Sequence, residues 1–182
     1  MPRPRVTYFP YVTSFRLTDG SLVRIRPIQA SDKFLFERSK RAGSFSDETM
    51  QRRFLAPKPI LSRSELRYLT EVDGRDHVAL VAVKDHAPGE LVAVARFVRL
   101  HDDPSTAEAA IVVADAKQGK GLGKKLALML ADAARERGIV RIQGTLLSDN
   151  PAAHRLMKAI GRRLEDHGHE RGVHELVAEL AA

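Results

Sequence analysis

The stretch "VADAKQGKGLGKKLALMLADAARERG" (residues 113–138) joins a glycine-rich loop to a long amphipathic segment. Its three glycines are spaced by single residues, and the apolar residues behind them recur at helical spacing up to Gly138. The pattern predicts a strand, a tight loop and a helix, in that order. Lys124 and Lys125 fall in the first helical turn, where unpaired N–H groups normally disfavour cations. Lysines at this position indicate that the loop holds an anion.

The loop departs from two common phosphate-binding patterns. A P-loop needs Ser or Thr after its Gly-Lys pair, and the dinucleotide-binding motif needs a wider gap before its third glycine. What remains is Gln118-x-x-Gly121-x-Gly123, whose backbone N–H groups can surround a pyrophosphate because no side chains stand in the way. The alternative is a helix start that uses glycine only for a tight turn.

The rest of the chain alternates strand and helix signals. Three apolar runs with short connections predict an antiparallel meander. Ser62 and Glu65 form a capping-box pattern at the start of one helix. We expect a single domain over residues 1–182, of α/β (α+β) class, with a mixed, mainly antiparallel sheet flanked by helices. The expected strands are 21–28, 77–83, 90–100, 107–115 and 140–150, the expected helices are 30–41, 46–55, 62–74, 122–138 and 151–161, and a hairpin is expected at 162–180.

Composition limits the classes of function. The chain has no cysteine, so disulfides and thiolate zinc sites are excluded. No run approaches membrane-spanning length and no apolar signal core follows Met1, so we expect a cytoplasmic protein without a membrane partner. Residues 1–60 hold 12 Lys and Arg against 5 Asp and Glu, which equals the whole net charge of +7. This basic third is read as a solvated face or as a surface for an acidic or phosphorylated partner. Nucleic acid is not favoured, because the aromatic residues that stack bases are missing.

Two motifs together resemble the GNAT superfamily of N-acetyltransferases. Q/R-x-x-G-x-G/A after a strand is similar to the coenzyme A pyrophosphate signature of that superfamily. A second pattern, N-x-x-A-x-x-L, recurs here as Asn150, Ala153 and Leu156. The segments "TDGSLVRIRPIQASD", "MQRRFL" and "AEAAIVVADAKQGKGLG" further resemble the catalytic domain of Pat-type bacterial protein lysine acetyltransferases.

The resemblance implies acetyl-CoA as co-substrate, no metal, and a protein lysine as acceptor. By resemblance, the coenzyme is bound through backbone groups of the strand before the loop, through the loop itself and through Asn150. The implied coenzyme-binding residues are Ile111, Val112, Val113, Gln118, Gly119, Lys120, Gly121, Leu122, Gly123, Lys124 and Asn150. Small-molecule amines as acceptors, a non-catalytic acyl-CoA sensor and a nucleic-acid binder remain alternatives.

Glu108 is the candidate general base. It lies among alanines and β-branched residues on the strand that leads into the glycine loop, and a carboxylate inside a sheet is costly unless paired or used. The resemblance assigns the base to this position. The alternative is a structural glutamate that pairs with Arg96 or Arg99. Many GNAT enzymes have a tyrosine as general acid where this chain has Met157, which cannot donate a proton.

The histidines of the C-terminal hairpin are not expected to bind a metal. His167, His169 and His174 fall near a predicted turn without a carboxylate or thiolate at ligand spacing. His154, beside the second motif, is read as a surface residue.

Overall fold

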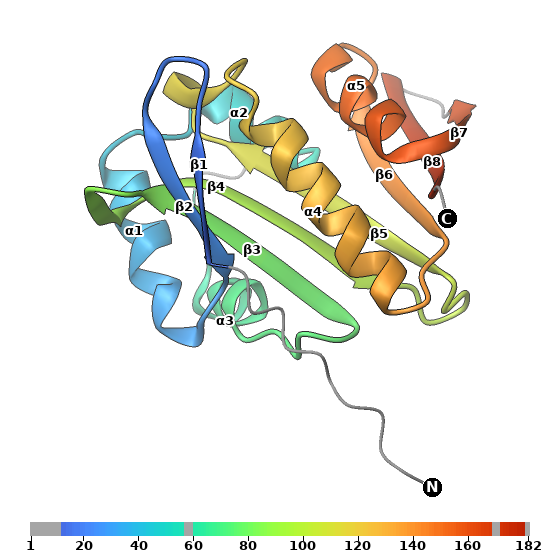
Figure 1. The fold of residues 1–182 in the computed structure, drawn as a ribbon, viewed down its shortest axis with the longest axis horizontal. Coiled ribbons are helices and arrows are strands. Elements are labelled where there is room, and N and C mark those ends of the chain that lie inside the picture. The colour runs from blue at the N-terminus through green and yellow to red at the C-terminus, as the bar shows by residue number, and fades with distance from the viewer. Residues whose placement is uncertain (1–11, 57–59, 169–171, 181–182) are drawn as a thin grey trace, which may run out of the picture.

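The computed structural model describes residues 12–56, 60–168 and 172–180. Within these ranges the chain forms one mixed sheet with helices on both faces, as Figure 1 shows. The strands are β1 (Thr13–Arg16), β2 (Leu22–Pro27), β3 (His77–Lys84), β4 (Ala87–Arg99), β5 (Thr106–Val113), β6 (Arg141–Leu147), β7 (Gly161–Gly168) and β8 (Val173–Leu180). The helices are α1 (Lys33–Arg41), α2 (Asp47–Phe54), α3 (Arg63–Thr70), α4 (Leu122–Glu136) and α5 (Pro151–Ile160).

The order of strands in the sheet is β1-β2-β3-β4-β5-β6-β8-β7. Every neighbouring pair is antiparallel except β5 and β6, which are parallel. This arrangement confirms the predicted class and the predicted meander. The prediction missed β1, and the strand expected at 90–100 begins earlier, at Ala87.

Two apolar cores lie on opposite faces of the sheet. The larger core contains the buried stripe of α4, which includes Leu122, Leu126 and Leu130, packed against inward residues of the strands. The smaller core lies under α1, around Leu35 and Val81. Residues that alternate along a strand therefore point into different cores. On β5, Ile111 faces the α4 core.

The ends of the helices follow local sequence signals. Ser62 accepts from the Glu65 N–H at 3.2 Å while the Glu65 carboxylate accepts from the Ser62 N–H at 2.7 Å, which confirms the capping box of α3. Ser46 caps α2 and Asn150 caps α5 with side-chain oxygens. Helix α4 differs, because its N-cap is Gly121 and no side chain caps it. The first N–H groups of α4 are therefore left without a side-chain acceptor.

Candidate active site

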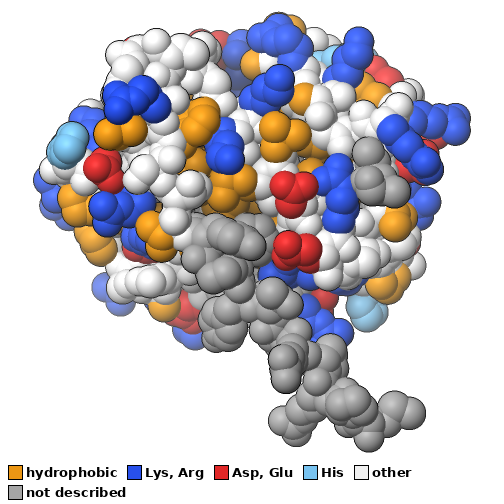
Figure 2. All heavy atoms as spheres, in the orientation of Figure 1, with side chains coloured by type: hydrophobic (Ala, Val, Ile, Leu, Met, Phe, Trp, Pro, Cys, Tyr) orange, Lys and Arg blue, Asp and Glu red, His pale blue; other side chains and the backbone are white. Residues whose placement is uncertain are grey.

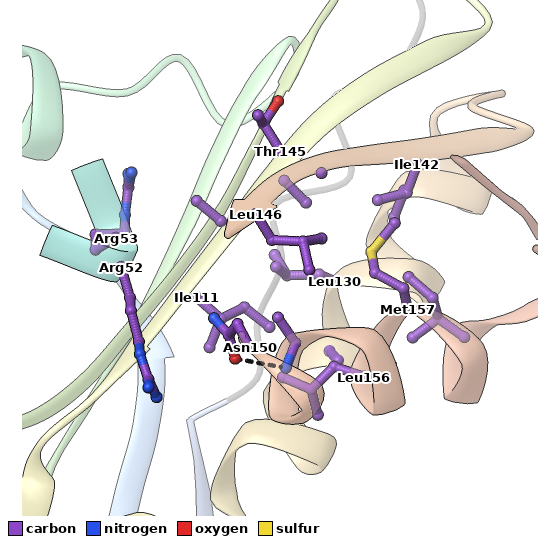
Figure 3. Close-up of a pocket in the computed structure, with 16 residues that line it drawn as sticks. Arg52, Arg53, Ile111, Leu130, Ile142, Thr145, Leu146, Asn150, Leu156 and Met157 are labelled. Carbon is purple, nitrogen blue, oxygen red and sulfur yellow. Dashed lines mark hydrogen bonds between the residues drawn. The ribbon is translucent and has the colours of Figure 1, made fainter. Parts of the chain in front are cut away.

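The parallel pair β5–β6 is short and then opens. The two strands pair from Thr106 and Arg141 to Glu108 and Gln143, and the pairing ends there. A pocket lies where they separate, between β5, β6, α2 and α5, and Figure 3 shows its lining side chains. The pocket is lined by Arg52, Arg53, Ala109, Ala110, Ile111, Ala127, Leu130, Ile142, Gly144, Thr145, Leu146, Asn150, Ala153, Leu156, Met157 and Ile160. The opening of the sheet therefore creates a mainly apolar slot with two arginines at one side.

The backbone of β5 has a free side at this opening. The Ala114 N–H donates to the Val92 carbonyl at 2.8 Å, which fixes the phase of the β4–β5 ladder. Because hydrogen-bonded pairs alternate along an antiparallel ladder, Val112 bonds with Val94 on β4, whereas Ile111 turns its N–H and C=O toward β6. The ladder with β6 has ended there. The Ile111 backbone groups consequently face the opening.

The glycine loop is held open by its backbone conformation. Gly119 has φ +69° and Gly121 has φ +87°, and a side-chain carbon added at either position meets no atom within 4 Å. Both glycines therefore serve the left-handed turn and leave the space beside the loop free. The uncapped start of α4 opens into this loop, so its N–H groups can receive an anion.

Gln118 connects the loop to two other elements. Its side-chain nitrogen lies 3.1 Å from the Val113 carbonyl, 3.0 Å from the Thr49 hydroxyl and 3.1 Å from the Asp115 carboxylate. Asp115 also accepts from the Ser46 N–H at 2.7 Å. These bonds fix the loop to the end of β5 and to the first turn of α2. The sequence motif included Gln118 but gave no sign of Thr49.

The lysines around the loop differ in their partners. Lys117 and Lys120 both donate to Asp19 in the β1–β2 turn, at 3.1 and 2.8 Å. These two bonds, together with bonds from Ser21, hold the pKa of Asp19 well below its usual range. The Lys125 ammonium lies 6.0 Å from the centre of the Phe15 ring, and Lys124 is exposed. Lys124, in the first turn of α4, is therefore exposed and has no ion-pair partner among the residues that the structure describes.

The second motif supplies one wall of the pocket. Asn150 uses its side-chain oxygen to accept from the Ala153 N–H at 3.1 Å, and this bond starts α5. Met157 is buried on the same helix and faces Gly144, where an added side-chain carbon would lie 3.5 Å from its sulfur. In Figure 3 Leu156 and Met157 lie across the pocket from the two arginines. His154 is exposed, as expected for a surface residue.

Glu108 lies in β5 with strands on both sides, but its side chain is exposed and not buried as the sequence suggested. It is the last residue of β5 that pairs with β6, so its exposed carboxylate lies beside the point where the two strands separate. The alternative pairing is not seen either. The Arg96 guanidinium donates to the Leu69 carbonyl at 2.9 Å, and Arg99 donates to Asp76 at 2.6 Å. No structural partner therefore accounts for Glu108 among the described residues.

Sequence reasoning missed Arg53, whose guanidinium lies close enough to Glu108 for the two charges to interact. Burial lowers the pKa of Arg53, and the Glu108 carboxylate offsets part of that effect. Burial and the positive charge of Arg53 lower the pKa of Arg96 to about 9. The Tyr68 side chain, which is 56% exposed, lies near both Arg53 and Arg96. The signal in the sequence was the Arg-Arg pair at the end of α2, which resembles an ordinary basic helix terminus.

His77 completes this group as a neutral side chain. Arg96 can only donate, so the His77 Nε2 atom at 3.1 Å must be an acceptor and the ring must be uncharged. Burial, followed by the charge of Arg96, lowers the pKa of His77 to about 4. Tyr68 stacks beside the ring with centroids 4.9 Å apart.

The lowered pKa predicts a pH dependence of folding. The unfolded histidine binds a proton near pH 6.5 and the folded one near pH 4, so stability is complete above pH 6.5 and falls as the pH drops through that window. We expect His77→Gln, whose amide oxygen can still accept from Arg96, to flatten this part of the curve. Urea unfolding of both proteins between pH 4 and 7.5 measures the difference. Parallel curves for the two proteins contradict the assignment.

The described residues contain no group of three or more His, Asp or Glu placed to hold a metal ion. His174 instead bonds Asp166 at 2.9 Å, and His169 lies outside the described residues. None of the helices in the described part of the chain combines the length and the apolar character that crossing a membrane requires.

Comparison with known proteins identifies the class of this fold and site. Residues 45–161 match the sequence model of the acetyltransferase (GNAT) family. The chain belongs to that family, as the two motifs indicated. Acetyltransferase Pat from Mycolicibacterium smegmatis is 36% identical over 126 residues, which are 68% of this chain and 36% of that protein. This chain therefore spans about a third of the length of that relative.

Solved structures agree in fold. The GNAT domain of S. lividans PAT superposes with a TM-score of 0.80 and 32% identity, covering 92% of this chain and 96% of that one. The structure of yncA, a putative acetyltransferase from Salmonella typhimurium with its cofactor acetyl-CoA, gives a TM-score of 0.64 at 20% identity, over 87% of this chain and 94% of that one. At that identity the second match supports the fold alone.

Proposed function

We propose that this protein uses acetyl-CoA to acetylate lysine side chains of other proteins. The observation that carries the proposal is the opening of β5 from β6 between Glu108 on one side and the uncapped glycine loop on the other. The Pat relatives support a protein lysine as acceptor, and membership of the acetyltransferase family supports acetyl-CoA as the co-substrate.

The residues present fit an extended coenzyme. The N–H groups of Gly119 to Gly123 and of the first turn of α4 would hold the pyrophosphate, with Lys124 adding positive charge. Lys120, whose ammonium is paired with Asp19, would contribute its backbone. The pantetheine arm carries amides, and the Ile111 N–H and C=O offer it the pairing that β6 no longer provides. The apolar wall formed by Leu156 and Met157 suits the methylene parts of the arm.

Glu108 would then act as general base. A lysine ammonium has no lone pair, so its proton must leave before the nitrogen attacks the thioester carbonyl. The new C–N bond forms as the C–S bond breaks, and coenzyme A departs as a thiolate. Met157 offers no proton, so the thiolate leaves as such or is protonated by water. A thiol pKa near ~8.5 makes that departure feasible.

A coenzyme A release assay tests the acceptor class. Purified protein is incubated with acetyl-CoA and either candidate protein substrates or small amines, and mass spectrometry locates the acetylated atom. We expect release that depends on protein and a label on lysine ε-nitrogens. Preferential acetylation of small amines would instead favour a small-molecule N-acetyltransferase. Binding of acetyl-CoA without turnover would favour a non-catalytic acyl-CoA sensor. Tight, sequence-selective duplex DNA binding at physiological salt would instead favour the nucleic-acid alternative.

A further inference from the structure

Arg53 occupies the side of the opening that the coenzyme assignment does not use. It lies in the last turn of α2, which packs on β5 and β6, and it lines the pocket with Ala110 and Thr145. In Figure 3 Arg52 and Arg53 leave α2 in opposite directions. Arg52 is paired, with Glu48 at 2.8 Å and Asp149 at 3.8 Å.

Arg53 has no such partner in the described part of the chain. No carboxylate there lies within ion-pair distance of its guanidinium, which instead lies 4.8 Å from the centre of the Phe54 ring. Glu108 is close enough to act on Arg53 electrostatically but forms no ion pair with it. A partly buried guanidinium keeps several donors that water no longer fully satisfies. The structure therefore presents an unused anion-binding group next to the candidate base.

The charges around Arg53 are unbalanced. Its guanidinium lies near the Glu108 carboxylate and also near the second guanidinium of Arg96, while His77 is neutral. Arg96 is only 4% exposed and bonds to Leu69 and His77, so Arg53, which lines the pocket, is the guanidinium that a ligand can reach. An incoming lysine ammonium adds a further positive charge. A negative group delivered with the lysine would restore the balance.

We infer that Arg53 binds an acidic residue next to the acceptor lysine, so that the enzyme selects lysines with Asp or Glu nearby. This inference rests on the proposed function, since it takes the acceptor to be a protein lysine. The planar guanidinium can donate two parallel hydrogen bonds to one carboxylate while Glu108 receives the ammonium. The basic residues 1–60 favour the same kind of partner, because they attract an acidic surface at long range. Figure 2 shows that Lys and Arg side chains are also widespread on the face that carries α4.

Two peptides with one lysine each test the inference, one with flanking glutamates and one with flanking glutamines. For the wild type we expect kcat/KM to favour the acidic peptide by about tenfold, the size of one charge-assisted hydrogen bond. Arg53→Gln should reduce that ratio to about one without changing the KM for acetyl-CoA. Arg53→Glu should favour a third peptide with flanking arginines. Arg163→Gln, on an exposed part of β7, removes the same charge far from the opening and should keep the tenfold ratio.

Thermal melting of each variant confirms that the compared proteins are folded. Equal rates for the acidic and neutral peptides in the wild type overturn the inference, as does an unchanged ratio in Arg53→Gln. In both cases lysine acetylation itself persists, so the proposed function stands. If no peptide is acetylated while a small carboxylate-bearing amine is, the proposed function and this inference fail together.

Discussion

Glu108→Gln should lower turnover by roughly 10²–10⁴-fold while acetyl-CoA binding stays nearly unchanged. The amide keeps the shape of the carboxylate but cannot accept the ammonium proton. The wild-type rate should rise with pH along an ionisation limb, and this limb should shift or vanish in the variant. Turnover and calorimetric binding on the same preparations measure both effects.

Because Glu108 is exposed, its substitution can separate a loss of catalysis from a loss of stability. A substitution at an exposed position without partners typically changes the free energy of unfolding by no more than about 0.5 kcal/mol. Glu90→Gln, on β4 and paired with Lys84, is a matched control that removes a carboxylate away from the opening and should keep full activity. A stable Glu108→Gln protein that works at the wild-type rate would mean that the base lies elsewhere.

Gly121→Glu should weaken acetyl-CoA binding by at least about tenfold, because it places a carboxylate against the proposed pyrophosphate site at the start of α4. Gly121 has φ +87°, so any side chain there strains the backbone. Gly121→Gln carries the same strain and nearly the same volume without the charge. The difference between the two variants therefore isolates electrostatic repulsion.

Isothermal calorimetry of both variants at two salt concentrations gives the comparison. We expect the gap between Glu and Gln to narrow at high salt, since screening weakens repulsion between exposed charges. Equal affinities for Gly121→Glu, Gly121→Gln and the wild type would remove the loop from the coenzyme site.

Local signals predicted much of the fold. The capping box of Ser62 and Glu65, the stripe of α4 and the glycines of the loop all act within a few residues, and each appears in the structure as expected. Strand β1 was missed because it is only four residues long with alternate residues exposed. So short a segment carries too little periodicity to identify a strand.

The surroundings of Glu108 were not accessible from sequence. Its place beside the opening depends on where the β5–β6 pairing ends, and these two strands are segments more than thirty residues apart. The approach of Arg53 depends on α2, which the bond between Thr49 and Asp115 fixes to the loop. Neither the end of the β5–β6 pairing nor the position of α2 is encoded by a pattern of neighbouring residues in the sequence. Family resemblance identified Glu108, but only the structure shows which charges lie around it.

Amide hydrogen exchange with and without acetyl-CoA tests the central claim, that the opening between β5 and β6 holds the coenzyme. We predict that binding slows exchange at Ile111, where the pantetheine arm would pair, and across residues 119–123, where the pyrophosphate would lie. The amide of Val112, which bonds to β4, should change little and serves as an internal reference. Protection of the loop and β5 together is the expected result. Tight binding of acetyl-CoA with no added protection at either place would contradict the account.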